Sequence, residues 1–548
     1  MGFGSDSAVS AESDTLPDDF QPPIFLDRTN DQDFRHQYKG GWEHFVGGGV
    51  AAFNCNNDGF TDLYVAGGEN KSKLLVNSGK SNVHFVHKAD NSTDLTAVTG
   101  AYPIDIDSDG ITDLAVLRAG ENVLLRGLGN CQFENANQRW NFTSEDRWTT
   151  AFSATWEQGH NSPTLVFGNY VDRKREGGPF GACDSHMLYR MSDNADRQAG
   201  NHTDHKTTPS AFTQPIALSP GFCTLSMLFS DWQRNGKADL RVSNDRHYYL
   251  HDGHEQLWNM APQPKLYQEE DGWQRFKIWG MGIASRDITG DGLPDYLLTS
   301  MSDQKFQTLK TNATGPEYID QAFDRGMIAH RPYTTDSDEG RPSTAWHAQF
   351  GDVNNDGYDD LFIAKGNVDQ MPDAAIKDPN NLLMQMQNGR FTEYGHSADI
   401  ADTARSRGGA LEDFNNDGLL DLVVVNRRAD LRIYQNVTFQ NKKSTNNHWL
   451  KVKVAQTGEN RDAIGAWITI KQQTKNAEQT VSREITIGGG HASGSLVTQH
   501  FGFGKGLGKN DHAVKVQIRW PDQTNSKWYT LSLDKTWHIV RGQSPQVQ

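Results

Sequence analysis

Residues 105–116 read DIDSDGITDLAV, a loop with aspartate at its positions 1, 3, 5 and 9 and glycine at position 6, followed at once by an apolar stretch. Five further stretches repeat the pattern, and a seventh, degenerate copy that starts at Trp156 keeps only the apolar tail. Successive starts are 51 to 75 residues apart, a spacing typical of a repeated supersecondary unit. The other five acidic copies are NCNNDGFTD at 54–62, DWQRNGKAD at 231–239, DITGDGLPD at 287–295, DVNNDGYDD at 352–360 and DFNNDGLLD at 413–421.

The segments around each copy predict strands. A small-residue stretch precedes the loop, and alternating, β-branched or aromatic residues follow it, at about four strands per unit. We therefore expect an all-β fold with a seven-bladed β-propeller over residues 23–440, carrying an insertion near 173–222. An open solenoid is the competing geometry, and closure is favoured because it removes exposed sheet edges. Residues 1–22 are expected to be flexible, and alternating strands over 447–545 predict a small C-terminal β-sandwich-like domain.

The loops have the chemistry of a calcium site. Calcium takes six to eight oxygen ligands, and side chains at positions 1, 3, 5 and 9 can converge if the chain turns sharply near glycine 6. An EF-hand is excluded because its bidentate glutamate at position 12 is replaced here by Val, Leu or Ile. We expect about five to six calcium ions, held by Asn54, Asn56, Asp58, Asp62, Asp105, Asp107, Asp109, the carbonyl of Ile111, Asp113, Asp231, Asn235, Asp239, Asp287, Thr289, Asp291, Asp295, Asp352, Asn354, Asp356, Asp360, Asp413, Asn415, Asp417 and Asp421.

A purely structural alternative exists for these loops. Asp and Asn side chains also stabilise turns by bonding nearby backbone N–H groups, without any metal. The alternative weighs most at 231–239, where Gln233 and Asn235 replace carboxylates. Six loops in the same register favour metal binding over turn formation alone.

Charge and composition narrow the function. The chain has 53 basic and 69 acidic residues, a net charge of −16, which argues against nucleic acid and favours cations or a basic partner. No apolar run approaches the roughly 18 residues of a membrane helix. Of the four cysteines, Cys183 and Cys223 are favoured as a disulfide because both flank one irregular stretch, with free buried thiols as the alternative. The polar, acidic first 20 residues do not form a signal peptide, so a leader removed from a secreted protein is the expectation.

The loops and the tail together carry a family resemblance. The loops resemble the FG-GAP or VCBS-type repeats of integrin α-subunit propellers. The tail reads NHWLKVKV from Asn447, NRDAIGAWITI at 460–470, GGGHASGSLVTQHFGFG at 488–504 and VKVQIRWPDQT at 514–524. In this order it resembles the ASPIC/UnbV domain of the cartilage acidic protein-like family. The resemblance implies an extracellular or periplasmic calcium-binding propeller in adhesion or matrix interaction, with an extracellular protein or glycan as partner.

No catalytic motif accompanies these features. We find no GxSxG, no HExxH and no supported Cys/His dyad in the sequence, so a binding module is favoured over an enzyme. An extracellular polysaccharide hydrolase or lyase, or a lectin, remains the alternative because 14 Trp and 15 Tyr could stack on sugars. In either case Trp42, His44, Trp346 and His347 are candidate ligand contacts at the funnel mouth. Core histidines are the structural alternative for His44 and His347.

Overall fold

The computed structural model describes residues 16–17, 19–176, 181–192, 211–245, 250–261, 263–334, 340–368, 371–440, 447–473, 478–505 and 512–548. These residues form an all-β fold, as predicted. They contain 3-10 helices at Thr29–Asp31, Trp42–His44 and Glu269–Asp271 and no α-helix. Among them, no helix has the length and hydropathy needed to cross a bilayer. The predicted flexible segment 1–22 lies mostly outside the described residues.

Most of the chain is built from antiparallel four-stranded units. An acidic loop joins the first strand to the second in every unit except that of β10–β13, where the degenerate copy lies. The second strand begins at position 9 of each acidic loop, so the motif marks the point where the chain enters the sheet. The units, in chain order, are β2 (Val50–Phe53), β3 (Asp62–Val65), β4 (Lys73–Asn77) and β5 (Phe85–His87); β6 (Val98–Ile104), β7 (Asp113–Gly120), β8 (Val123–Gly129) and β9 (Gln132–Asn135); β10 (Arg147–Thr155), β11 (Thr164–Asn169), β12 (His186–Tyr189) and β13 (Ile216–Leu218); β14 (Thr224–Ser230), β15 (Asp239–Asn244), β16 (Gln256–Asn259) and β17 (Lys265–Leu266); β18 (Gly280–Arg286), β19 (Asp295–Ser300), β20 (Lys305–Leu309) and β21 (Tyr318–Asp320); β22 (Ala345–Gly351), β23 (Asp360–Lys365), β24 (Asn381–Gln385) and β25 (Phe391–Glu393); and β26 (Arg405–Glu412), β27 (Asp421–Arg427) and β28 (Arg432–Asn436) with β1 (Phe25–Asp27).

The units close into a ring. Their first strands contact one another in the order β2, β6, β10, β14, β18, β22, β26 and back to β2. The N-terminal strand β1 pairs with β28, so a segment from one end of the chain completes the sheet formed near residue 430. This closure makes the architecture a propeller and excludes the open solenoid. The degenerate copy at Trp156 lies after β10, and its apolar tail forms β11 as the repeat predicts.

The segment near 173–222 differs from the prediction. The sequence predicts an insertion there, but the segment supplies β12 and β13, the two outer strands of the four-stranded unit that begins with β10. Residues 177–180 and 193–210 of this segment lie outside the described residues. Sequence analysis does not find these two strands because they are short, and the long polar stretch around them hides their alternation of apolar and polar residues.

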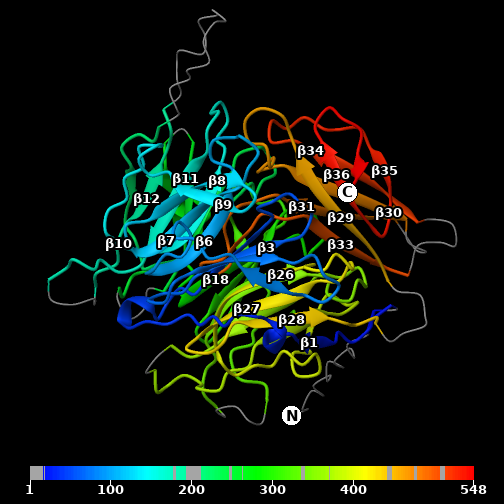
Figure 1. Ribbon diagram of the computed structural model, residues 1–548, viewed down its shortest axis with the longest axis horizontal. Coiled ribbons are helices and arrows are strands. Elements are labelled where there is room, and N and C mark those ends of the chain that lie inside the picture. The colour runs from blue at the N-terminus through cyan, green and yellow to red at the C-terminus, as the bar shows by residue number, and fades with distance from the viewer. Residues whose placement is uncertain are drawn as a thin grey trace, which may run out of the picture.

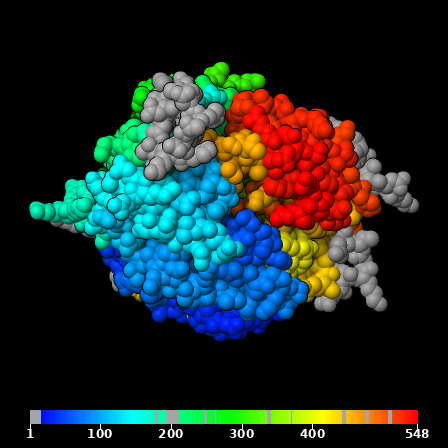
Figure 2. Space-filling view, turned by 45° about the horizontal axis from the view of Figure 1, so that its top comes forward, coloured from blue at the N-terminus to red at the C-terminus, as the bar shows by residue number. Residues whose placement is uncertain are grey.

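The C-terminal domain is a pair of four-stranded sheets, as predicted. One contains β29 (His448–Ala455), β33 (Gln499–Gly504), β36 (Lys535–Val540) and β37 (Gln546–Val547), and the other contains β30 (Trp467–Gln473), β31 (Glu478–Glu484), β34 (Ala513–Arg519) and β35 (Tyr529–Ser532). In Figure 1 these strands, orange to red, gather at one side of the molecule. Their hydrophobic core is continuous with that of the units formed by β6–β13. Figure 2 shows the red C-terminal surface in direct contact with the rest of the protein.

A glycine-rich part of the C-terminal domain fills the middle of the ring. This central segment, residues 485–498, includes β32 (Gly494–Ser495), which pairs in parallel with β2. Its backbone bonds the first strands of five units, from Leu496 N to Ala52 O (2.9 Å), Ala101 N to Ala492 O (3.2 Å), Ala154 N to Ile487 O (3.3 Å), Gly489 N to Met227 O (2.6 Å) and Gly490 N to Ile283 O (2.7 Å). The propeller and the C-terminal domain therefore share one packed centre.

Candidate metal-binding loops

The six acidic loops share one backbone conformation. The glycine at position 6 has a positive φ in every copy, from 84° at Gly292 to 93° at Gly357, which confirms the predicted sharp turn. Position 4 also lies in the left-handed region, although its residue varies. The residues at position 4 are Asn57, Ser108, Arg234, Gly290, Asn355 and Asn416.

Position 4 also links neighbouring loops. The side-chain amide of Asn355 donates to the carbonyl of Gly418 in the next loop (2.9 Å), and Asn416 donates to Gly59 beyond it (3.0 Å). Arg234 makes the equivalent bond to Gly292 (3.1 Å). The loops are therefore coupled to one another around the propeller, a feature that sequence analysis missed. The frequency of Asn and Gly at position 4, four of six copies, was the available signal for its backbone conformation.

The aspartates at positions 1 and 9 are tied to the backbone. In the loop at 105–113, Asp105 accepts from the N–H groups of Asp109 (3.1 Å) and Gly110 (2.9 Å). Asp113 accepts from Ile106 within the loop and from Gly127 at the third strand, both at 2.8 Å. The corresponding bonds to position 9 recur at Asp62, Asp360 and Asp421. These bonds are those of the structural alternative, and they leave further carboxylate lone pairs for a cation.

The loop at 105–113 shows the clearest convergence of ligands. Single carboxylate oxygens of Asp105, Asp107 and Asp109 all lie within 4.8 Å of one another. Arg126 bonds two of these three aspartates. Its Nε lies 2.7 Å from Asp107 Oδ2, and its guanidinium also donates to Asp109 Oδ2. Asp107 Oδ1 is buried and has no hydrogen-bond partner. A buried, unpartnered carboxylate oxygen beside two others is the donor set that a hard divalent cation requires.

The other loops fit a cation less uniformly. At 231–239, Asp239 is held by Trp232 Nε1 (2.8 Å) and the Tyr267 hydroxyl (3.0 Å), so the structural alternative is strongest there, as expected. Where position 3 is asparagine, its side-chain amide donates to the aspartate at position 5. Asn354, for example, donates to Asp356 (2.9 Å). The same bond joins Asn56 to Asp58 and Asn415 to Asp417, whereas Thr289 bonds Asp295. Seven further ligand candidates each accept a hydrogen bond from a backbone N–H of their own loop. They are Asn54, Asp231, Asn235, Asp287, Asp291, Asp352 and Asp413.

Burial, together with crowding by other carboxylates, raises the pKa of many loop carboxyls. Burial, followed by the neighbouring carboxylates Asp462 and Asp109, raises the pKa of Asp105 to about 7. Burial and the adjacent Asp295 raise the pKa of Asp287 to about 7. Burial and the neighbours Asp413 and Asp417 raise the pKa of Asp421 well above its usual range. Burial and the neighbouring carboxylates thus disfavour the charged forms of these carboxyls in the metal-free protein.

This crowding predicts that the metal-free protein is more stable at pH 6.5 than at pH 8. The folded state holds protons more tightly than the unfolded chain, so stability is lost as the pH rises through the folded pKa values. These are about 7 for Asp105 and Asp287 and about 8 for the buried Glu412 and Glu484. Below pH 6.5 five histidines oppose this trend and partly offset it, because burial lowers their pKa to about 3 or 4. They are His36, His186, His347, His491 and His500.

Thermal melting in the presence of EDTA across pH 5 to 8.5 measures this dependence. The Tm of the metal-free protein is expected to fall between pH 6.5 and pH 8.5, and the same series with calcium should lose this decline. A metal-free Tm that keeps rising to pH 8.5 would contradict the pKa assignment.

The C-terminal domain lies over the face that carries the loops. Asn460 N reaches Ser108 Oγ in the second loop (3.3 Å), and Asp231 N and Ser230 Oγ donate to Glu484 (2.8 and 2.7 Å). Gly504 N bonds Asn355 O (2.7 Å). The loops thus form much of the docking surface between the two parts of the chain.

The funnel residues lie in different environments. Trp346 is fully buried between Arg407, 4.0 Å above its ring, and the ring of His491 in the central segment. His347 is buried and accepts from the His491 N–H at Nδ1 (3.2 Å). His44 is buried near Glu69, whereas Trp42 is 52% exposed. Trp346 and His347 thus contact the protein's own C-terminal domain.

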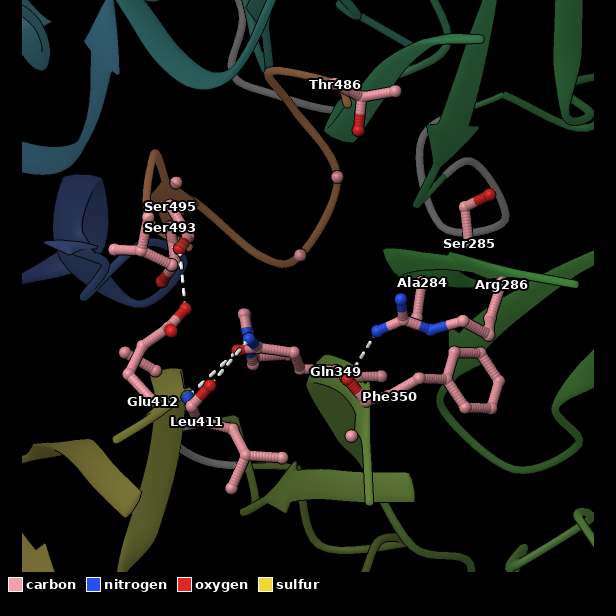
Figure 3. Close-up of a pocket in the computed structure, with 18 of the residues that line it drawn as sticks. Ala284, Ser285, Arg286, Gln349, Phe350, Leu411, Glu412, Thr486, Ser493 and Ser495 are labelled. Atoms are coloured by element: carbon pink, nitrogen blue, oxygen red, sulfur yellow. Dashed lines mark hydrogen bonds between the residues drawn. The ribbon is translucent and has the colours of Figure 1, made fainter. Parts of the chain in front are cut away.

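A cavity of about 180 Å³ remains beside the central segment. Figure 3 shows Glu412 pointing to Ser495 of that segment, at 2.7 Å, and Gln349 bonded to the backbone of Leu411. Arg286 caps the carbonyl of Phe350 on the other side (2.9 Å). The bond between Ser495 and Glu412 crosses the junction of the two domains, whereas the bonds of Gln349 and Arg286 join neighbouring first strands of the propeller.

Two disulfide bonds cross-link strands and loops of the propeller. Cys183 pairs with Cys223, as predicted, and Cys55 pairs with Cys131. The second bond ties the first acidic loop to the turn between β8 and β9 of the next unit. Cys55 and Cys131 also lie close to Asp62, but both sulfurs are committed to the disulfide, so this group is not a thiolate metal site.

Comparisons with known proteins agree with the repeats and the tail. The FG-GAP-like repeat family matches residues 54–116 and 352–424, and the ASPIC and UnbV family matches residues 456–546. Cartilage acidic protein 1 of Mus musculus is 29% identical over 243 residues, 44% of this chain and 34% of the relative. The Homo sapiens protein is 30% identical over 118 residues, 22% of this chain and 16% of the relative. The matches thus span at most about a third of the length of these relatives.

A solved structure of BBS1N in complex with ARL6DN also aligns with the chain. It has a TM-score of 0.41 and 11% identity, and the alignment covers 77% of this chain and 98% of that one.

Proposed function

We propose that this chain, which carries FG-GAP-like repeats and an ASPIC and UnbV domain, is an extracellular or periplasmic calcium-binding interaction module. The observation that carries the proposal is the set of converging carboxylates at Asp105, Asp107 and Asp109, with one buried oxygen that has no partner. Two disulfides support an oxidising compartment.

The residues present fit calcium. Asp105, Asp107, Asp109 and Asp113 would hold an ion in the second loop, with Asp287, Asp291 and Asp295 or Asp352, Asp356 and Asp360 as the corresponding sets in later loops. A bound divalent ion supplies positive charge to these crowded carboxylates. The chain itself fixes the loop shape through its backbone bonds and presses the C-terminal domain onto the same face. Calcium would thus stabilise both the propeller and its interface with the C-terminal domain.

The proposed partner is an extracellular protein or glycan, in an adhesion-type interaction. The central segment occupies the middle of the ring, so we propose that the interaction uses the outer surface. The exposed Trp42, which packs on Phe45 and Trp148, is a rigid aromatic anchor of the kind found in binding sites.

Calcium is expected to raise the melting temperature of the EDTA-treated protein. Each occupied loop contributes about 2.7 kcal/mol when calcium is at 100 times its dissociation constant. Differential scanning calorimetry with EDTA, calcium and an equal concentration of magnesium measures the effect. Asp107→Asn is the matched variant, because it keeps the side-chain size but removes the charge of the best-formed site. Identical melting curves with EDTA and calcium would refute calcium binding.

A further inference from the structure

A lysine of the C-terminal domain binds inside one of the acidic loops. Lys451, on β29, places its ammonium 2.9 Å from Asp413 Oδ2 and 2.7 Å from Asn416 Oδ1. Both partners of the ion pair are almost fully enclosed, at 5% and 2% side-chain exposure. The residues at positions 1 and 4 of the loop therefore already coordinate a positive charge.

The surrounding contacts hold the lysine in place. His500 Nε2 bonds the carbonyl of Gly418 (3.1 Å), at position 6 of the same loop. A Cβ added to Gly418 would lie 2.0 Å from Trp449 Nε1, so β29 and β33 are pressed directly onto the turn. Asp413 Oδ2 accepts from Gly418 N (3.0 Å) as well as from the ammonium. Lys451 therefore belongs to the surface of the C-terminal domain that packs on the acidic loop.

The preceding loop offers a natural comparison. DVNNDGYDD at 352–360 and DFNNDGLLD at 413–421 share their residues at positions 1, 3, 4, 5, 6 and 9. The C-terminal domain places Gly502 against Asp352, where an added Cβ would lie 2.0 Å from Oδ2. Asn355 Oδ1, the counterpart of the oxygen that Lys451 binds, is buried with no hydrogen-bond partner. Two loops of nearly identical ligands thus differ in whether a side-chain cation bonds the carboxylate at position 1.

We propose that Lys451 is the resident cation of the loop at 413–421 and excludes calcium from it, while the loop at 352–360 is left for a metal ion. An ammonium bonded to the position 1 carboxylate opposes a divalent ion on the same ligands, because like charges a few ångströms apart repel strongly in a buried site. In the loop at 105–113, by contrast, Arg126 bonds the outer oxygens Asp107 Oδ2 and Asp109 Oδ2 at positions 3 and 5, and leaves Asp107 Oδ1 beside the position 1 carboxylate of Asp105 for an ion. The last acidic loop then anchors the C-terminal domain instead of binding metal. This inference rests on the proposed calcium binding.

The test counts calcium ions bound per chain, by plasma mass spectrometry after equilibrium dialysis of the full-length protein. Lys451→Met keeps an apolar stem and removes the charge, and it should bind one more calcium ion than the wild type. Lys453→Met, two residues along the same strand, is the matched control and should leave the number unchanged.

A second pair of variants tests the same inference without disturbing the lysine. Asp352→Asn should lower the number of bound ions by one, whereas Asp413→Asn should not change it. An unchanged number in Lys451→Met, or the loss of one ion in Asp413→Asn, would overturn the inference alone. A wild-type protein that binds no calcium would instead overturn the proposed function.

Discussion

Replacing Gly49 by alanine is expected to displace the central segment from the middle of the propeller. A Cβ at position 49 would lie 1.7 Å from the carbonyl oxygen of Ala492 and 2.4 Å from its carbonyl carbon. Both are backbone atoms, and that oxygen accepts the N–H of Ala101, so no rotamer change relieves the clash. Overpacking of this kind costs about 3 kcal/mol, and here the displaced segment also loses its bonds to several first strands.

Amide hydrogen exchange reports the displacement directly. The N–H groups of Gly489 and Gly490 bond Met227 and Ile283 in the wild type and should lose their protection in Gly49→Ala. Gly41→Ala is the control, because the nearest atom to its added Cβ is Glu69 Oε1 at 3.6 Å, an ordinary contact. Unchanged protection of both amides in Gly49→Ala would show that the segment is not held as described.

The acidic repeat predicts the propeller well for a physical reason. Position 9 is both the last polar residue of the loop and the first residue of the second strand, so its spacing sets where each sheet begins. β7 starts at Asp113 and β23 at Asp360, as the motif indicates. The glycine at position 6 predicts the turn for the same reason, since its positive φ is a local requirement. Local chemistry of this kind is readable from a single sequence.

The contacts between the two domains were not predictable in this way. GGGH at 488–491 has the composition of a turn in the C-terminal domain, and nothing nearby shows that it enters the propeller. Lys451 lies on an alternating strand and has no local feature that marks it as a cation for a loop 38 residues away. The burial of Trp346 and His347 depends on the same packing, so the residues lining the propeller centre could be predicted but their neighbours could not. Metal ligands at these loops remain predictions that the stoichiometry experiments test.

Asp359→Asn is expected to cause the second large loss of stability. Asp359 is at position 8 of the loop at 352–360 and accepts from Arg483 of the C-terminal domain, at 2.8 and 3.1 Å. Arg286 of β18 lies 3.5 Å away on the propeller side. Burial alone would raise the pKa of Asp359, but the two guanidinium groups hold it below its usual value. The carboxylate is therefore ionised and joins cations from both domains.

The asparagine has nearly the same shape but leaves two enclosed guanidinium groups without their counter-charge. Breaking such a pair on one side costs about 3–5 kcal/mol, more than the net value of the intact interaction. Urea unfolding measures the loss, and Asp522→Asn is the control because its pair with Arg541 is exposed and should contribute under about 1 kcal/mol. Adding Arg483→Met to Asp359→Asn should recover part of the stability, since it removes one of the stranded charges. A loss of less than about 1 kcal/mol in Asp359→Asn would mean that this ion pair does not secure the junction between the domains.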